Sequence, residues 1–193
     1  MKKRVKNIII AIIICIILAG WIALFNYISP QELVAKLGAR NGYLILFLLG
    51  ILGGASTFTG PSYFLALTTL SVAGLNPLFL ALAGGIGVTI GDSIILILGI
   101  NAGKKFPGEF KEKVDKLKSF LEKKPEKMIP FLVYLYIGLT PFPNEFVTIP
   151  LGLTGYKLRK IIPIILLGNL TSGMIFALTG IYGINYFPKF LSR

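Results

Sequence analysis

The sequence predicts an all-α polytopic membrane protein with two inverted repeats, each a re-entrant, proline-broken helical hairpin followed by a transmembrane helix. The chain is 54% hydrophobic with a mean hydropathy of +0.78, which is too apolar for an ordinary water-soluble domain. Two apolar stretches are interrupted by prolines, and short Lys- and Arg-rich blocks separate the apolar stretches. We therefore expect one membrane domain over residues 1–193.

The net charge of +12 favours a membrane surface over nucleic acid as the partner, because the basic residues fall in blocks between apolar runs. Cys15 is the only cysteine, so the sequence contains no disulfide framework. The absence of His excludes the common zinc sites and His-based acid–base catalysis. We expect no metal, no cofactor and no enzyme activity.

The first element is an N-terminal transmembrane helix over residues 7–28. Four basic residues precede its apolar run, and no clear small-x-small cleavage site follows it, so we expect the helix to be retained. These charges predict a cytoplasmic N-terminus in a multi-pass protein of the plasma membrane. Residues 29–41 then form a short external connection.

Repeat 1 covers residues 43–101. Its apolar stretch at 43–74 is longer than the about 20 residues of one crossing and shorter than the about 40 of two. We expect residues 43–55 to enter the membrane, 56–62 to turn and 63–73 to return, before a helix from Pro77 to about residue 100. In the alternative topology residues 43–74 span the membrane once, which would remove the inversion.

A basic segment at residues 104–127 separates the repeats, with nine Lys against five acidic residues. Apolar residues recur in it at three- and four-residue spacing: Phe106, Phe110, Val114, Leu117 and Leu121. This pattern predicts a cytoplasmic amphipathic helix on the anionic inner leaflet. The alternative is a solvated helix packed against the floor of the domain.

Repeat 2 covers residues 128–187. Residues 128–139 enter, 140–145 turn and 146–153 return, and a last helix crosses at about 161–186. Prolines lack a backbone donor and clash with the preceding helical turn, so this irregular backbone needs a covering of protein or a watery cavity. Lys157, Arg159 and Lys160 mark the return to the cytoplasm and are candidates for headgroup contact.

The first hairpin opens outside and the second inside, so the repeats are predicted to be inverted and the binding site is expected where the two breaks meet. Half-helix N-termini after the prolines present unpaired N–H groups that could bind a lipid phosphate, although these groups could instead satisfy the broken backbone. The predicted substrate-binding residues at the breaks are Thr59, Gly60, Pro61, Ser62, Thr140, Pro141, Pro143 and Asn144.

Asp92 and Glu145 are the only acidic residues in the apolar segments. A charge at the bilayer centre costs about 2.5–3.5 kcal/mol on insertion scales, so each side chain should face a cavity, pair with another group or be protonated. We predict a proton-coupling pair. The alternative is that either acid caps the N-terminus of a half-helix.

The order of these features resembles the DedA family, the broader group with the VTT domain, over residues 50–183. In the first half the matching residues are Pro61, Gly74, Asn76, Pro77, Gly84, Gly87, Gly91, Asp92, Gly99, Gly103 and Lys104. In the second half they are Pro141, Pro143, Gly155, Gly168, Asn169 and Gly173, and Asn169 joins the predicted substrate-binding residues.

The chain departs from that family's pattern at both breaks. Thr59, Gly60 and Ser62 stand where the family often has an acid, and Gly138 and Asn144 stand near its usual arginines. The departures indicate a divergent branch. The resemblance implies transport or scrambling of membrane lipids, in some members recycling of polyprenyl phosphate, coupled to protons.

We therefore expect a transporter that moves a phospholipid or polyprenyl phosphate between leaflets, and the architecture is compatible with a homo-oligomer. Two rivals remain open. A drug or cation exporter would use the two lone acids equally well, and a non-transporting membrane scaffold would need neither acid.

Overall fold

The computed structural model describes residues 36, 38–57, 59–103, 109–125 and 127–191. The predicted N-terminal helix at 7–28 lies outside these residues. Over the described residues every regular element is an α-helix, which confirms the all-helical prediction. The helices are α3 (Ala39–Ala55), α4 (Gly60–Val72), α5 (Pro77–Gly103), α6 (Glu109–Glu122), α7 (Met128–Leu139), α8 (Glu145–Leu153) and α9 (Leu158–Leu191).

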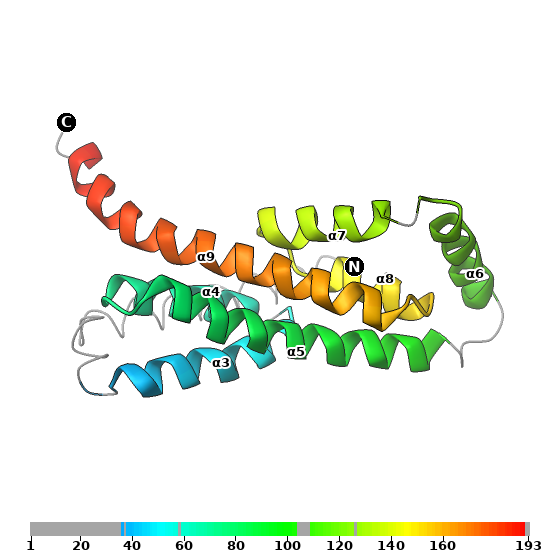
Figure 1. Cartoon of the computed structure of the whole chain (residues 1–193), viewed down its shortest axis with the longest axis horizontal. Coiled ribbons are helices and arrows are strands. Elements are labelled where there is room, and N and C mark those ends of the chain that lie inside the picture. Colours follow the sequence, from blue (N-terminus) through cyan, green and yellow to red (C-terminus); the bar gives the residue numbers. More distant parts are fainter. Residues whose placement is uncertain (1–35, 37, 58, 104–108, 126, 192–193) are drawn as a thin grey trace, which may run out of the picture.

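Two long helices, α5 and α9, pack along each other through the middle of the molecule (Figure 1). Gly85 of α5 faces Leu170 and Ala81 faces Gly173, so the two helices run in opposite directions. Helix α3 lies along the left half of Figure 1, α7 and α8 lie along the right half, and α6 closes the right end. The short helices therefore approach the middle of the long pair from its two ends.

Each long helix also contacts short helices from both halves of the chain. Helix α5 packs against α3 and against α8, whereas α9 packs against α7 and against α4. If α3, α4 and α5 of the first half are exchanged for α7, α8 and α9 of the second half, these helix contacts are reproduced. The two halves are thereby interlocked rather than placed side by side.

The two breaks interrupt the helices close to the predicted positions. Helix α3 ends at Ala55 as expected, but α4 begins at Gly60 instead of residue 63, because Pro61 is tolerated in the first helical turn. At the second break α7 ends at Leu139 and α8 begins at Glu145. The hydroxyl of Tyr136 spans that break and donates to the carbonyl of Pro143 at 3.1 Å.

Helices α4 and α8 end in the same way. Gly74 and Gly155 have φ angles of 95° and 71°, in the left-handed region that glycine adopts without steric cost. The N–H after each glycine turns back to the helix, from Leu75 to Leu70 and from Tyr156 to Leu151. This is the Schellman pattern, and it ends each short helix just before a long one begins.

Helices α3 and α5 approach closely because glycines line their contact. Gly87 and Gly91 of α5 lie against the backbone of α3 at Phe47 and Ile51, and Gly54 of α3 lies against Val88. Small residues of this kind let membrane helices pack backbone to backbone. The first hairpin is therefore fixed against the first half of α5.

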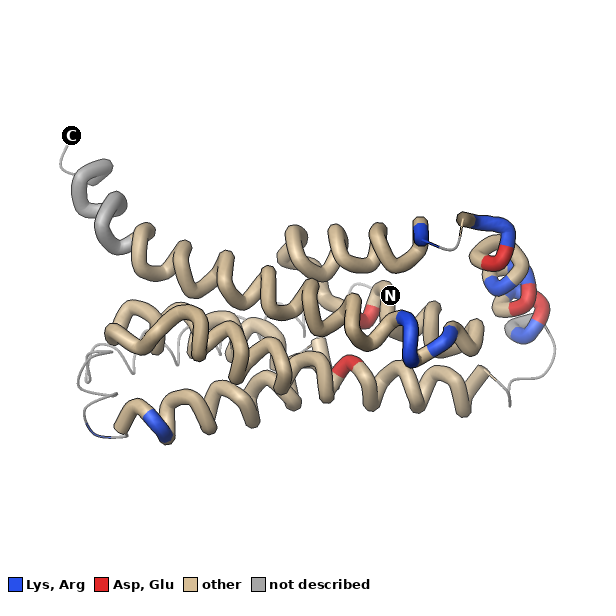
Figure 2. The backbone as a smooth tube through the Cα atoms, viewed as in Figure 1, with Lys and Arg blue, Asp and Glu red and all other residues tan. Residues whose placement is uncertain are grey.

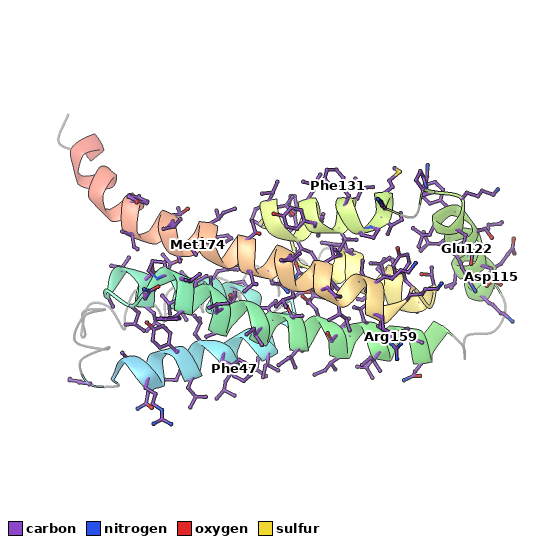
Figure 3. The ribbon with its side chains drawn as sticks, in the orientation of Figure 1. Phe47, Asp115, Glu122, Phe131, Arg159 and Met174 are labelled. Carbon is purple, nitrogen blue, oxygen red and sulfur yellow. The ribbon has the colours of Figure 1, made fainter. Side chains whose placement is uncertain are left out.

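The outside of the bundle is apolar. A stripe of isoleucines on α5 is exposed at three- and four-residue spacing, and Phe131 of α7 is 60% exposed and projects away from the bundle (Figure 3). Helix α5 and residues Leu158–Gly183 of α9 are long and apolar enough to cross a membrane. The exposed stripe consists of Ile86, Ile90, Ile94 and Ile97.

Charged residues lie at the two ends of the described bundle, apart from an acidic position in the middle of α5 and one at the start of α8 (Figure 2). Basic residues are densest at the end formed by α6 and the start of α9. Val114 of α6 is buried, and Leu121 packs against the core that contains Ile129. One face of α6 therefore packs against the domain, and the other face, with Phe120, is exposed as contact with the inner leaflet would require.

Candidate functional site

One cavity of about 240 Å³ lies between the two helix breaks. The first break contributes Gly60 and Pro61, and the second contributes the segment from Thr140 to Glu145. Helix α9 completes the wall with Asn169 and Ser172. The two interruptions of the sequence, about 80 residues apart, thus meet in one place.

Most of the predicted substrate-binding residues line this cavity, but two do not. Ser62 lies outside the lining, and so does Thr59, whose hydroxyl donates to the carbonyls of Leu52 and Ser56 and thereby closes the first break. The lining includes eight predicted site residues: Gly60, Pro61, Thr140, Pro141, Pro143, Asn144, Glu145 and Asn169.

Asp92 lies directly behind the cavity and is fully buried in the middle of α5. Its Oδ2 accepts hydrogen bonds from Nδ2 of Asn144 and from Nδ2 of Asn169, both at 2.9 Å. The two amide groups line the cavity, so they connect its interior to the carboxyl group. Because Asp92 is within a continuous helix, it does not cap a half-helix.

The hydrogen-bond network continues on both sides of this carboxyl group. Asn144 also donates to Oδ1 of Asn169 at 3.0 Å, and Asn169 also donates to the hydroxyl of Thr89 at 3.1 Å. Thr89 in turn donates to the carbonyl of Gly85 at 2.7 Å. The network therefore joins α5, α9 and the second break through the carboxyl group of Asp92.

Three buried side-chain oxygens near the cavity have no hydrogen-bond partner among the described residues. They are Oδ1 of Asp92, Oε1 of Glu145 and Oγ1 of Thr148. A buried polar atom without a partner is costly, so these oxygens are suited to a proton, a cation or a ligand hydrogen-bond donor.

The cavity has an acidic interior and an apolar rim. Among the described residues its lining includes Glu145 and neither Lys nor Arg. Pro141 and Phe142 line it and are also exposed, with Phe142 61% exposed. No group of three His, Cys, Asp or Glu side chains that could hold a metal occurs in the described part of the chain.

Sequence reasoning missed several polar residues at or beside the cavity, among them Thr57, Tyr63 and Ser172 in its lining. Thr89 precedes Asp92 by three positions on the same helix face, and Thr148 has the same spacing from Glu145, so both could have been found from that periodicity. Ser172 follows the predicted residue Asn169 by three positions on α9, so the same periodicity could have found it.

The three basic residues after α8 that were predicted to contact lipid headgroups do not line the cavity between the breaks. Lys157 and Lys160 line a second cavity at the α6 end of the bundle, and Arg159 is exposed and lines neither cavity.

No protein-family model, no curated protein and no solved structure matches this chain.

Proposed function

We propose that this chain is a membrane transporter that moves lipids between leaflets, with Asp92 and Glu145 as its proton-coupling pair. The observation that carries the proposal is the single cavity between two helix breaks, with unpartnered carboxyl oxygens beside it. Broken helices that meet near the middle of a bundle are typical of secondary transporters. A transporter has a use for costly buried acids, whereas a scaffold has none.

In this proposal the two halves of the chain are inverted repeats in the plasma membrane, with a cytoplasmic N-terminus. The opposite directions of α5 and α9, the exchange pattern of helix contacts and the matching turns at Gly74 and Gly155 support the inversion. Each hairpin would then be re-entrant from one membrane surface. Membership of the DedA and VTT group would account for this architecture and is part of the proposal.

The size of the cavity favours a lipid headgroup over a whole drug molecule. Pockets that enclose drug-sized ligands usually measure about 300–1,000 Å³. This cavity measures about 240 Å³, and its rim at Pro141 and Phe142 borders the apolar exterior. A headgroup would occupy the polar interior while its acyl chains stay in the membrane.

The charge of the cavity favours a zwitterionic phospholipid over polyprenyl phosphate. Glu145 would repel a phosphate that carries no compensating charge, and no lysine or arginine in the described lining offsets it. A headgroup amine would instead pair with that carboxylate.

Leaflet exchange in sealed proteoliposomes tests the proposal. We expect a labelled zwitterionic phospholipid to exchange faster than in protein-free vesicles, to exchange faster than labelled polyprenyl phosphate, and to respond to a pH gradient. If neither lipid exchanges and the protein instead protects cells from a soluble compound in a gradient-dependent manner, the small-solute exporter replaces the lipid transporter. If both measurements are negative, the scaffold remains.

The proposed topology predicts opposite labelling of two cysteines. In a Cys15→Ser background, Asn76→Cys should react with an impermeant thiol reagent from outside the cell and Arg159→Cys only from the cytoplasm. Both residues are exposed, and they lie at the starts of the antiparallel helices α5 and α9, which are at opposite ends of the bundle. Labelling of Asn76→Cys only from the cytoplasm would contradict the inversion and leave the topology in which residues 43–74 span once.

A further inference from the structure

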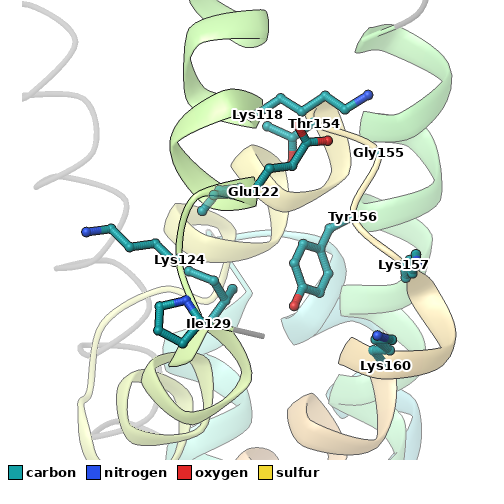
Figure 4. A pocket seen from close by; sticks show the side chains of 11 residues that line it. Lys118, Glu122, Lys124, Ile129, Thr154, Gly155, Tyr156, Lys157 and Lys160 are labelled. Atoms are coloured by element: carbon teal, nitrogen blue, oxygen red, sulfur yellow. The ribbon is translucent and has the colours of Figure 1, made fainter. Parts of the chain in front are cut away.

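A second cavity, of about 320 Å³, lies at the end of the bundle where α6 meets the turn between α8 and α9. Figure 4 shows the ring of Tyr156 in its centre, with Lys124 on one side and Lys157 and Lys160 on the other. Lys118 lies above them on α6. The cavity thus collects lysines from two segments that are far apart in the sequence.

The lining of this cavity is strongly basic. It contains four lysines, and Glu122 is its one acidic residue. This excess of positive side chains around one cavity attracts anions to it. Tyr156 lies among these lysines, and a phenol hydroxyl is protonated at neutral pH and can donate to an anion.

We propose that this lysine cavity, lined by Lys118, Lys124, Lys157 and Lys160 around Tyr156, binds a phosphate monoester group. Ammonium groups bind phosphate as point charges and donate to its oxygens. The bound phosphate would connect α6 to the start of α9 and so fix the position of the basic helix. The proposal does not depend on lipid transport through the central cavity.

The phosphate could belong to an anionic lipid or to a soluble compound, and the surroundings favour the lipid. Phe120 is 54% exposed on α6, and Lys124 lies 4.7 Å from the centre of its ring. An exposed aromatic ring beside lysines is typical of a helix that contacts an anionic membrane surface. In the proposed topology this end of the bundle faces the cytoplasmic leaflet.

Two double variants of the full-length protein distinguish anion binding in the cavity from attraction to the overall positive charge of the surface. Lys118→Ala with Lys124→Ala removes two charges from the lining, whereas Lys113→Ala with Lys123→Ala removes two exposed charges of the same segment that do not line it. Binding is measured for phosphatidic acid and phosphatidylcholine in nanodiscs, and for inorganic phosphate and glycerol phosphate in solution.

We expect wild type to bind phosphatidic acid at least tenfold more tightly than phosphatidylcholine. The cavity variant should lose that preference, and the exposed variant should change it less than twofold. Displacement of phosphatidic acid by millimolar glycerol phosphate, or lysine-dependent binding of glycerol phosphate alone, would support the site and assign it to a soluble phosphate. Equal effects of the two double variants, or no binding of any phosphate probe, would overturn the proposal.

Discussion

Replacing Asp92 by Asn is expected to lower gradient-driven lipid exchange tenfold or more. The substitution preserves the shape of a fully buried side chain that accepts from Asn144 and Asn169, but it removes the charge and the ability to carry a proton. An asparagine cannot exchange a proton with the cavity, so a step that needs this exchange should slow by about tenfold or more, which corresponds to at least about 1.4 kcal/mol in its barrier. The initial rate of exchange in sealed proteoliposomes measures the effect.

Glu145→Gln should show a loss in the same assay, because its carboxyl group lines the cavity and has an unpartnered oxygen. Asp115→Asn is the matched control, since Asp115 is an exposed acid on α6 (Figure 3) and should leave exchange unchanged. Full gradient-dependent exchange by both the Asp92 and the Glu145 variants would rule out proton coupling through this pair.

Gly91→Ala is expected to destabilise the folded protein by about 1–3 kcal/mol, the usual cost of overpacking. A methyl group at Gly91 would collide with the α3 backbone at Ile51 and Ala55, neither of which is the end of a flexible side chain. The two helices would have to separate, and the first hairpin would shift away from α5. Thermal unfolding of the purified protein in detergent measures the loss.

Gly183→Ala is the control for this prediction. Gly183 is also within a long helix, but a methyl group there meets no atom within 4 Å. Alanine has the higher helix propensity by about 1 kcal/mol, so the variant should be as stable as wild type or slightly more stable. Equal destabilisation by the two substitutions would show that the α3–α5 contact is not the cause.

The helices could be predicted from the sequence because their signals are local. Pro61, Pro141 and Pro143 interrupt apolar runs, and Gly74 and Gly155 precede the long helices, so α7 was predicted with the bounds that the structure has. The start of α4 was predicted three residues too late. Pro61 was assigned to the turn, whereas it lies in the first turn of the helix.

The site was predicted only in part, because its assembly depends on contacts between distant segments. Asp92 and Glu145 stood out as lone acids in apolar segments, and Asn144 was found through its place in the break. That both asparagine amides donate to Asp92 could not be seen without the packing of α9 on α5. Thr59 and Thr140 are both threonines at a helix break, so the sequence does not distinguish them. The hydroxyl of Thr59 donates to the carbonyl of Leu52 on α3, whereas Thr140 lines the cavity.

The most direct test of the central claim is to block the cavity from within. In a Cys15→Ser background, Thr57→Cys places a thiol at an exposed position of the cavity lining, and Leu52→Cys places one at a 55% exposed position of α3 outside it. We predict that a bulky, membrane-permeant maleimide abolishes lipid exchange by the Thr57 variant and leaves exchange by the Leu52 variant unchanged. Full exchange by the completely labelled Thr57 variant would contradict transport through this cavity.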